Sequence, residues 1–498
     1  MFRFVVAAWL LLGGSALAAL DPALVARLSS GDNDAKVEAI GQLVASGDPD
    51  ALALLKSMAD GELRFEGQEV TVNNRVRREL EAAMAALQLL SPDRGVRLAA
   101  VKSLQSSADE SLLPLVKKAL ERETDAGIRA DLALIAAALD LKGSDKGARL
   151  AAVKLLESSS NPATKTILLP LADKSEPDED VRRAAQASLK TVEARLARAN
   201  FVGLMFSGVS LGSILLLAAL GLAISYGLMG VINMAHGELI MIGAYTTYVV
   251  QNLFRAHLPG AFDYYLLFAV PAAFAVSGLV GMVLERSVIR WLYGRPLETL
   301  LATWGISLVL IQAVRTIFGA QNVQVENPAF MSGGVEIFTG IVLPWSRIVI
   351  IVFAGAVLGA IGLLLARTRL GLFVRGVTQN RAMAACVGVP TARVDTLAFG
   401  LGSGLAGLAG CALSQIGNVG PDLGQAYIVD SFMVVVLGGV GQLAGTIYAA
   451  LGLGFANKLL ESWSGAVLAK IVVLVFIIVF IQKRPQGLFA LKGRSVEA

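Results

Sequence analysis

The chain has 498 residues, of which 55% are hydrophobic and only 16% are charged. Because a soluble domain carries about a quarter charged residues, this composition excludes an ordinary soluble protein and predicts a large membrane-embedded part. The formal net charge is only +4, and the sequence has no basic stripe with interleaved aromatic residues, so we expect no nucleic-acid partner. Charged residues are concentrated before residue 200 and the remainder is apolar and rich in glycine, which predicts two domains.

The first 18 residues have the order of a secretory signal peptide. Arg3 supplies a short positive region, Phe4 to Leu12 an apolar core, and Ala16-Leu17-Ala18 a small-residue cleavage site. The alternative, a first membrane-spanning helix, needs roughly 20 apolar residues, which this run does not reach. We therefore predict a signal peptide at 1–18 and an extracytoplasmic domain at 19–200.

The 19–200 region is helical by pattern and contains an internal repeat. The six residues Arg97–Lys102 recur as Arg149–Lys154, 52 residues further on. Apolar residues in each copy fall three or four apart, so each helix has one apolar face, and stacked helix pairs bury such faces against one another. The pattern loosely resembles HEAT-type repeats, with a longer period. Such a stack is either a binding surface, for a substrate-binding protein or a neighbouring subunit, or a passive spacer, and the sequence leaves both interpretations open.

The 201–498 region has the pattern of a polytopic α-helical membrane domain. We expect about eight or nine membrane segments, some broken or re-entrant, so the whole chain is predicted to be all-α. Four glycines in the run near 400 recur at helix spacing, which allows close helix approach in lipid. They are Gly400, Gly404, Gly407 and Gly410. Long apolar runs cover 202–226, 266–284, 298–318, 346–366, 394–416 and 466–482, and shorter glycine-broken stretches cover 230–250 and 428–460.

The distribution of basic residues predicts the topology in the bacterial inner membrane. Arginines cluster at 286–295 and 367–393, and further basic residues follow from Lys483, whereas the loops near 251–265 and 319–345 carry one arginine at most. By the positive-inside rule the basic connections and the C-terminus are cytoplasmic. A secreted N-terminal domain then requires an odd number of crossings. A pair of arginines just before the first apolar run, Arg195 and Arg198, opposes this orientation.

Two glycine-interrupted segments, 226–238 and 427–445, place polar residues between apolar stretches. Because a charge at a helix centre costs roughly 2.5–3.5 kcal/mol on insertion scales, such residues are candidates for a translocation path along broken helices. The alternative is that these side chains cap the helix breaks and never touch cargo. The candidates are Asn233, His236, Glu238, Asp430 and Gln442.

The sequence gives no support for an enzyme. It contains only two histidines, His236 and His257, with no serine paired to either by spacing, and no cluster of metal ligands. It also lacks the Gly-Lys dipeptide that a P-loop requires. We therefore predict a transporter permease with no catalytic residues, metal or cofactor of its own. The energy then comes from a partner, or from an ion gradient.

Over about 205–495 the chain resembles the branched-chain amino-acid permease family of ABC transporters. Three stretches carry the resemblance, namely Gly230–Glu238, Ala384–Pro390 and Gly438–Gly441. Within that family the long secreted extension is similar to the urea-transport branch, and further stretches also match it. These are Arg295–Gly305, Gly420–Gln425 and Pro485–Phe489.

The resemblance implies a core of two permease subunits, the second a different chain, together with cytoplasmic ATPase subunits, an extracytoplasmic substrate-binding protein and surrounding membrane lipid. It implies urea or a similar small amide as cargo, with branched-chain or other amino acids as the alternative. It also implies that the stretch from Arg381 to Pro390 is a coupling helix, whose small residues dock into the ATPase and whose glycine permits the turn that follows. The implied coupling residues are Arg381, Ala384, Ala385 and Gly388.

Overall fold

The computed structural model describes residues 24–489, apart from short gaps at 25–26, 29–31, 47–48, 61–63, 66–67, 70–71, 108–111, 144, 160 and 339–340. The predicted signal peptide therefore lies outside the described residues. The chain divides between Arg198 and Ala199 into two compact units. Helix α11 (Glu179–Met229) contributes residues to both units.

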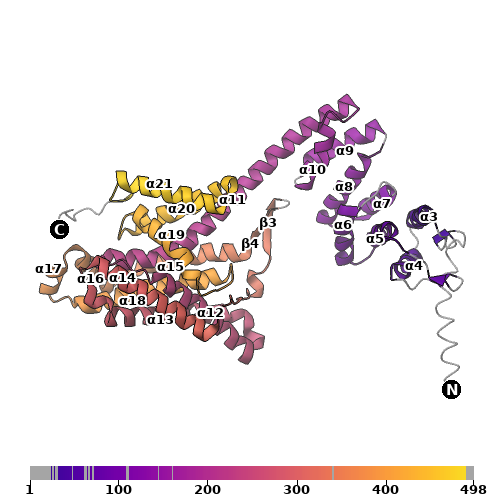
Figure 1. Cartoon of the computed structure of the whole chain (residues 1–498). Helices are drawn as coiled ribbons and strands as arrows, with labels where there is room; N and C mark the ends of the chain where they lie inside the picture. The colour runs from indigo at the N-terminus through magenta and orange to yellow at the C-terminus, as the bar shows by residue number, and fades with distance from the viewer. Residues whose placement is uncertain are drawn as a thin grey trace, which may run out of the picture. The chain divides into compact units, whose positions relative to one another are not determined.

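The first unit consists of short helices that pack on their neighbours in the chain (Figure 1). Their buried leucines, valines and alanines form two cores, one around Leu80, Val101 and Leu132 and one around Val153 and Leu168. The helical character predicted for this region is confirmed, and the likeness to HEAT repeats stays a prediction. One short hairpin, β1 (Arg64–Phe65) with β2 (Gln68–Glu69), was not expected from the sequence. The helices are α3 (Asn33–Ser46), α4 (Pro49–Ala59), α5 (Asn74–Gln88), α6 (Arg94–Ser107), α7 (Leu113–Arg122), α8 (Ala126–Asp140), α9 (Lys146–Ser158) and α10 (Ala163–Ala172).

The internal repeat corresponds to a repeated ion pair. Arg97 of α6 donates from Nε to Glu123 Oε2 at 2.8 Å, and Arg149 of α9 donates from Nη2 to Glu176 Oε2 at 2.6 Å. Both glutamates are buried. Each arginine follows, by four residues, an aspartate whose side chain accepts backbone N–H groups at the start of its helix, an arrangement that satisfies orphan donors. These aspartates are Asp93 and Asp145.

We expect a Glu123→Gln variant to destabilise the first unit by about 2–3 kcal/mol at neutral pH, because it leaves the largely buried Arg97 without its charged partner. The hydrogen bond from Arg97 holds the pKa of Glu123 below its ordinary value of 4.5. A lowered pKa stabilises the fold above the pKa of the unfolded chain, and the stabilisation is lost as pH falls below about 4.5 towards the folded value.

Calorimetry of the full chain in detergent tests this expectation. The native transition should fall with pH below about 4.5 more steeply than that of Glu123→Gln. Glu121→Gln is the control and should match the native chain, because Glu121 is an exposed carboxylate in the last turn of α7, two residues before Glu123. Equal stability of the Glu123 and Glu121 variants at pH 7 would contradict the role of the buried pair.

The second unit contains the apolar helices. Among the described residues, seven are long and apolar enough to cross a membrane, and they lie in α11, α13, α14, α15, α18, α20 and α21. The sequence predicts eight or nine segments because it also counts two weaker helices. Of these, α12 has 22 residues but carries several polar ones, and α19, at 16 residues or about 24 Å, is shorter than the hydrocarbon core. The helices are α12 (His236–His257), α13 (Tyr265–Ser287), α14 (Pro296–Phe318), α15 (Trp345–Arg367), α16 (Arg369–Gln379), α17 (Arg381–Cys386), α18 (Thr391–Ser414), α19 (Leu423–Gly438), α20 (Leu443–Ser464) and α21 (Ala466–Lys483).

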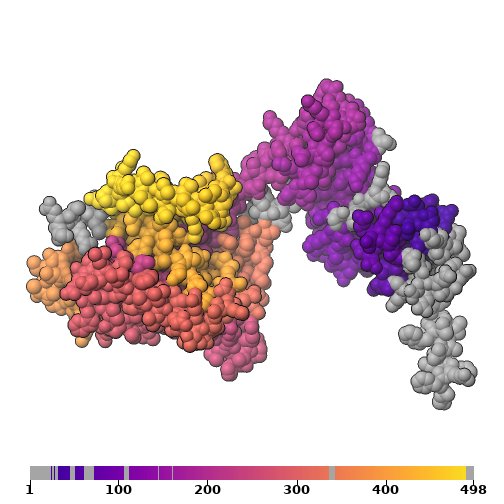
Figure 2. Space-filling view, viewed as in Figure 1, coloured from indigo at the N-terminus to yellow at the C-terminus, as the bar shows by residue number. Residues whose placement is uncertain are grey.

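Helix α18 forms the centre of this unit and is buried over almost its whole length. Its predicted glycine row is confirmed as a packing surface. A Cβ on Gly407 would overlap the Ala273 carbonyl oxygen of α13, and one on Gly410 would overlap the Ile240 carbonyl oxygen of α12. Helix α21, by contrast, forms an outer layer of the unit (Figure 2) and is mostly unburied.

The connections of the second unit separate into two ends (Figure 1). At one end, Tyr293 between α13 and α14 touches Met229 at the end of α11, and Arg290 reaches the Ala392 carbonyl oxygen at the start of α18. The opposite end carries an antiparallel hairpin that the sequence did not predict, β3 (Gly334–Phe338) with β4 (Ile341–Pro344). The two arginine-rich connections that the sequence places in the cytoplasm therefore lie at one end of the unit.

Candidate functional site

The first candidate site is the break between α11 and α12. Helix α11 ends at Met229, Gly230 adopts φ +66°, and helix resumes only at His236. The positive φ explains the glycine, since other residues rarely adopt it. The broken segment leaves backbone groups without helical partners, which in a membrane must be satisfied inside the protein.

Two of the predicted path residues, Asn233 and His236, form hydrogen bonds with backbone groups at this break. The Oδ1 of Asn233 accepts the backbone N–H of Ala235 at 3.0 Å. The Nε2 of His236 lies 2.9 Å from the Ala218 carbonyl oxygen of α11, which requires Nε2 to carry the proton. Both side chains are buried. These contacts hold the break in place, which agrees with the alternative that the two side chains cap a helix break and do not touch cargo.

Glu238 is different because one of its carboxyl oxygens has no partner. It is only 2% exposed, and its Oε2 has no hydrogen-bond partner among the described residues. An unpartnered buried carboxyl oxygen is costly unless a ligand or water completes it. Glu238 is therefore the predicted path residue with free capacity to contact cargo.

Helix α14 contributes a polar stripe that the sequence analysis missed. The backbone N–H of Met234 donates to the Oγ1 of Thr303 at 3.1 Å, which fastens the break to α14. Thr299, Thr303 and Ser307 are all buried. Their spacing of four residues places them on one helix face, and this spacing is the signal that could have identified them.

The second break lies between α19 and α20 and packs against the end of α11. Gly439 and Gly441 have φ of +98° and +75°. A Cβ on Gly227, near the end of α11, would lie 2.5 Å from the Cα of Gly441, so the second break is in direct contact with the last turn of α11, just before the first break. Gln442 at this break is only half-buried. The structure thus brings together the two glycine-broken segments that the sequence singled out.

Asp430 belongs to a different environment from the other candidates. It is buried on α19, and its Oδ2 lies 3.4 Å from the Nζ of Lys470 on α21. This ion pair joins neighbouring helices, so it stabilises their packing. The Asp430 carboxylate is then already paired and is not available to a cargo. The contacts of Asp430 therefore favour a structural role.

The second candidate site is the arginine-rich end, where α16 and α17 connect α15 to α18. Helix α17 begins with Asn380 as N-cap, whose Oδ1 accepts the Met383 N–H at 2.9 Å. Gly388 has φ +87°, and a Cβ there would meet no atom within 4 Å. Ala385 is exposed, whereas Ala384 packs inward in a small core with Leu228.

The inward position of Ala384 differs from the expectation of a docking residue, because Ala384 is the one buried residue of α17 while the other five are exposed. The outward apolar side chains are instead Met383, 61% exposed, and Val387, 72% exposed. Exposed apolar side chains of this size mark an interaction surface when they lie together. The sequence analysis missed both residues.

A buried polar cluster, here called the hub, lies directly behind α17. Arg381 forms an ion pair with Asp395 of α18, and its guanidinium lies 5.1 Å from the centre of the Tyr293 ring. The Tyr293 hydroxyl donates to Glu285 Oε1 of α13 at 2.9 Å. Burial and the nearby carboxylates of Asp395 and Glu285 raise the pKa of Tyr293, which keeps this hydroxyl protonated.

The hub connects α17 to the first break. Tyr293, which contacts Arg381, also places its hydroxyl 3.2 Å from the Sδ of Met229, the residue immediately before Gly230. Glu285 in turn accepts the Thr396 hydroxyl of α18 at 2.6 Å. A displacement of α17 would therefore act through side-chain contacts on α13, α18 and the end of α11.

A helical membrane unit with two broken helices in contact, a buried carboxyl oxygen left free at the break and an exposed helix at its basic end belongs to the class of transport permeases. Residues 204–481 match the family described as branched-chain amino acid transport system / permease component. Because the match covers more than half of the chain, the protein belongs to this family of multi-pass inner-membrane permeases.

The curated relatives agree with this assignment. The high-affinity branched-chain amino acid transport system permease protein LivH of Salmonella typhimurium is 29% identical over 295 residues, which cover 58% of this chain and 95% of LivH. The corresponding protein BraD of Pseudomonas aeruginosa is 28% identical over the same shares. The ribose import permease protein RbsC of Escherichia coli is 28% identical over 39% of this chain and 60% of its own length. No solved structure matches the chain.

These relatives are transporter permeases, which agrees with the prediction that the chain is not itself an enzyme. The names of LivH and BraD refer to branched-chain amino acid transport, and that of RbsC refers to ribose import. The family match begins at residue 204, so it does not include the first unit, which ends at Arg198.

We expect a Glu238→Gln variant to lower uptake by about tenfold at equal protein level, because a charged hydrogen bond to cargo contributes about 1.5–3 kcal/mol. Asp430→Asn is the matched control, a second buried membrane carboxylate, and should leave uptake per molecule unchanged. Initial rates of labelled-cargo uptake, normalised to membrane protein, make the comparison. Normal uptake by the Glu238 variant would exclude a cargo contact at this residue.

Proposed function

We propose that this protein is the membrane-spanning permease subunit of an ATP-driven importer, and that the breaks at 230–235 and 439–442 form part of its translocation path. The free carboxyl oxygen of Glu238 carries this proposal, because it is a buried polar group without a partner beside a helix break. The chain also belongs to a family of permeases. Alternating access then corresponds to movement of the two breaks against each other.

The arginine-rich end is proposed to face the cytoplasm, by the positive-inside rule. In this orientation Met383, Ala385, Val387 and Gly388 form a docking surface for a cytoplasmic ATPase subunit that binds ATP and Mg²⁺. The hub then transmits docking to the first break through Arg381 and Tyr293. The C-terminus is cytoplasmic and the first unit extracytoplasmic.

The further partners follow from the same proposal. A second, different permease subunit would complete the membrane core, and an extracytoplasmic binding protein would deliver the cargo. The first unit, as a HEAT-like stack, would supply a surface for that binding protein or for a neighbouring subunit. Its regular buried Arg–Glu pairs support a rigid stack.

Branched-chain amino acids are the cargo that the relatives favour. Urea remains the second candidate on one observation. The stretch Arg295–Gly305, which carries the resemblance to the urea branch, supplies Thr299 and Thr303 to the polar stripe beside the first break. Hydroxyl groups suit a small neutral amide, which needs hydrogen bonds and no ion pair.

Uptake assays separate the two cargos. A strain lacking this gene should lose uptake of labelled leucine, and the native gene should restore it. Loss of urea uptake with unchanged leucine uptake would reverse the order of the two candidates. Unchanged uptake of both compounds would overturn the importer proposal for these cargos.

A further inference from the structure

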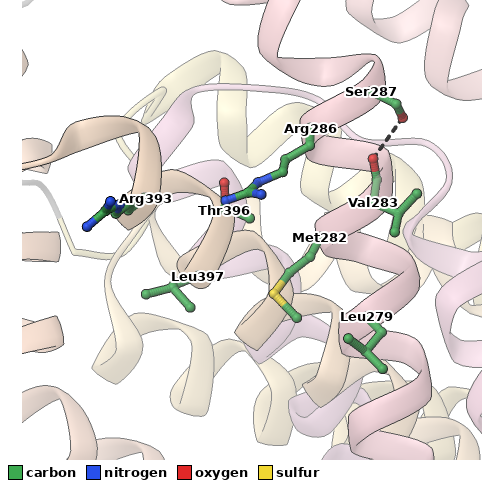
Figure 3. Close-up of a pocket in the computed structure, with 8 residues that line it drawn as sticks. All are labelled: Leu279, Met282, Val283, Arg286, Ser287, Arg393, Thr396 and Leu397. Atoms are coloured by element: carbon green, nitrogen blue, oxygen red, sulfur yellow. Dashed lines mark hydrogen bonds between the residues drawn. The ribbon is translucent and has the colours of Figure 1, made fainter.

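A groove of about 640 Å³ lies between α13 and α18 at the arginine-rich end of the second unit (Figure 3). The functions described above do not use it. Its apolar wall comes from Leu279, Met282 and Val283 on α13 and Leu397 on α18, and its mouth carries Arg286 and Arg393. The groove therefore combines two cations with an apolar wall.

The two arginines are not neutralised by the protein. Arg286 and Arg393 are exposed, and neither forms an ion pair among the described residues. The acidic residues closest to them in sequence, Glu285 and Asp395, are buried and belong to the hub, where they bind Tyr293, Thr396 and Arg381. The groove lining itself contains no carboxylate. An anion entering the groove would thus meet two free guanidinium groups.

The apolar wall is the outer face of a membrane helix. Leu279, Val283 and Arg286 follow one another at four and three residues, so they lie along one face of α13. Leu279 and Val283 are exposed, and so is Leu397, four residues after Arg393 on α18. Figure 3 shows Arg286 extending from α13 towards Thr396 of α18, above the apolar side chains.

The hydroxyl groups beside the arginines are already engaged. Ser287 donates to the Val283 carbonyl oxygen at 2.7 Å, and Thr396 donates to Glu285. Recognition in the groove therefore comes from the charge of the two arginines and from apolar contact, the combination that binds a charged head group with an attached hydrocarbon chain.

We propose that this groove binds an anionic phospholipid, with the phosphate group held between Arg286 and Arg393 and an acyl chain lying along Leu279, Val283 and Leu397. Charge complementarity and the position at the end of two membrane helices select this occupant. A second copy of the chain would have to present an acidic and apolar ridge to the same groove. The proposal depends on the membrane placement of α13 and α18 and not on the importer cargo.

Native mass spectrometry of the full chain in mild detergent tests the proposal, with phosphatidylglycerol and phosphatidylcholine of identical acyl chains as probes. We expect the native chain to prefer phosphatidylglycerol. An Arg286→Gln, Arg393→Gln double variant should bind it about 30-fold more weakly, the fold-change for about 1 kcal/mol at each arginine. An Arg367→Gln, Arg369→Gln double variant removes two exposed arginines at the same end, outside the groove, and should bind within about twofold of the native chain.

Three results would overturn the proposal. The native chain could bind both lipids equally, the groove variant could keep the preference, or the two double variants could lose it equally. A dimer of the native chain that the groove variant fails to form would assign the groove to a second copy. If the double variant is not recovered folded, Arg393→Gln alone, with an expected loss of about fivefold, makes the same comparison.

Discussion

A Gly388→Arg variant is expected to insert normally into the membrane and to lose about 100-fold in uptake, which corresponds to about 3 kcal/mol of lost docking free energy. Gly388 has φ +87° and faces open space, with no atom within 4 Å of a Cβ. An arginine there would project into the space that the proposed ATPase subunit occupies. Membrane fractionation and initial uptake rates measure the two parts of the expectation.

Two controls separate docking from backbone strain. Gly388→Ala imposes the unfavourable φ, at about 1–2 kcal/mol, without the bulk, and should retain most uptake. Gly376→Arg adds the same side chain on the exposed surface of α16, at an ordinary φ, and should be tolerated. Normal uptake by Gly388→Arg would refute the coupling role of this turn, and complete loss in Gly388→Ala would assign the effect to the backbone.

An Arg381→Gln variant is expected to destabilise the second unit by about 2 kcal/mol more than Asp395→Asn, although both remove the same ion pair. Asp395 is only 1% exposed, whereas Arg381 is 42% exposed. Removing the arginine leaves a buried carboxylate without its cation, while removing the carboxylate leaves an arginine that water can solvate. The double variant should therefore be more stable than Arg381→Gln alone.

Thermal unfolding of the purified chain in detergent gives this order directly. Uptake provides the functional readout, because the hub is proposed to carry movement from α17 to the first break. We expect an assembled transporter that carries Arg381→Gln to keep the ATP hydrolysis of its ATPase subunits while its rate of uptake falls. Equal stability of the two single variants would show that Asp395 does not depend on Arg381.

The helices of the second unit could be predicted from the sequence because runs of about 20 apolar residues leave few alternatives in lipid. The breaks could be located because Gly230 and the glycines at 438–441 interrupt such runs. The glycine row of α18 was readable for a similar reason, since small residues at helix spacing have one main use in a membrane.

The hub could not be predicted, because its members come from distant parts of the chain. Thr396 and Glu285 are 111 residues apart, and Tyr293 and Met229 are 64 residues apart. Pairing at such separations depends on how helices pack, which one sequence does not specify. The orientation of α17 was also hidden, since its six residues are too few for a periodic pattern to distinguish Ala384 from Met383.

The repeat of the first unit has one part that could be predicted from the sequence and one part that could not. The copies at Arg97 and Arg149 were visible in the sequence, and their helices follow as predicted. The glutamates that bind them, Glu123 and Glu176, lie 26 and 27 residues further on. Each stands two residues before an aspartate and six before an arginine, a shared pattern that the sequence analysis missed, but their pairing with Arg97 and Arg149 depends on how the helices stack. The ion pair that repeats is thus a property of the stacked helices.

Cross-linking from Cys386 tests the central claim most directly. Cys386 is exposed on α17, while Cys411, the other cysteine, is buried, so a maleimide photo-cross-linker should label the proposed docking surface alone. We predict that illumination of native membranes links this residue to an ATP-hydrolysing subunit, and that Gly388→Arg abolishes the product. Absence of that product from the native chain, or its persistence in the Gly388 variant, would contradict the account of the protein as an ATPase-coupled importer permease.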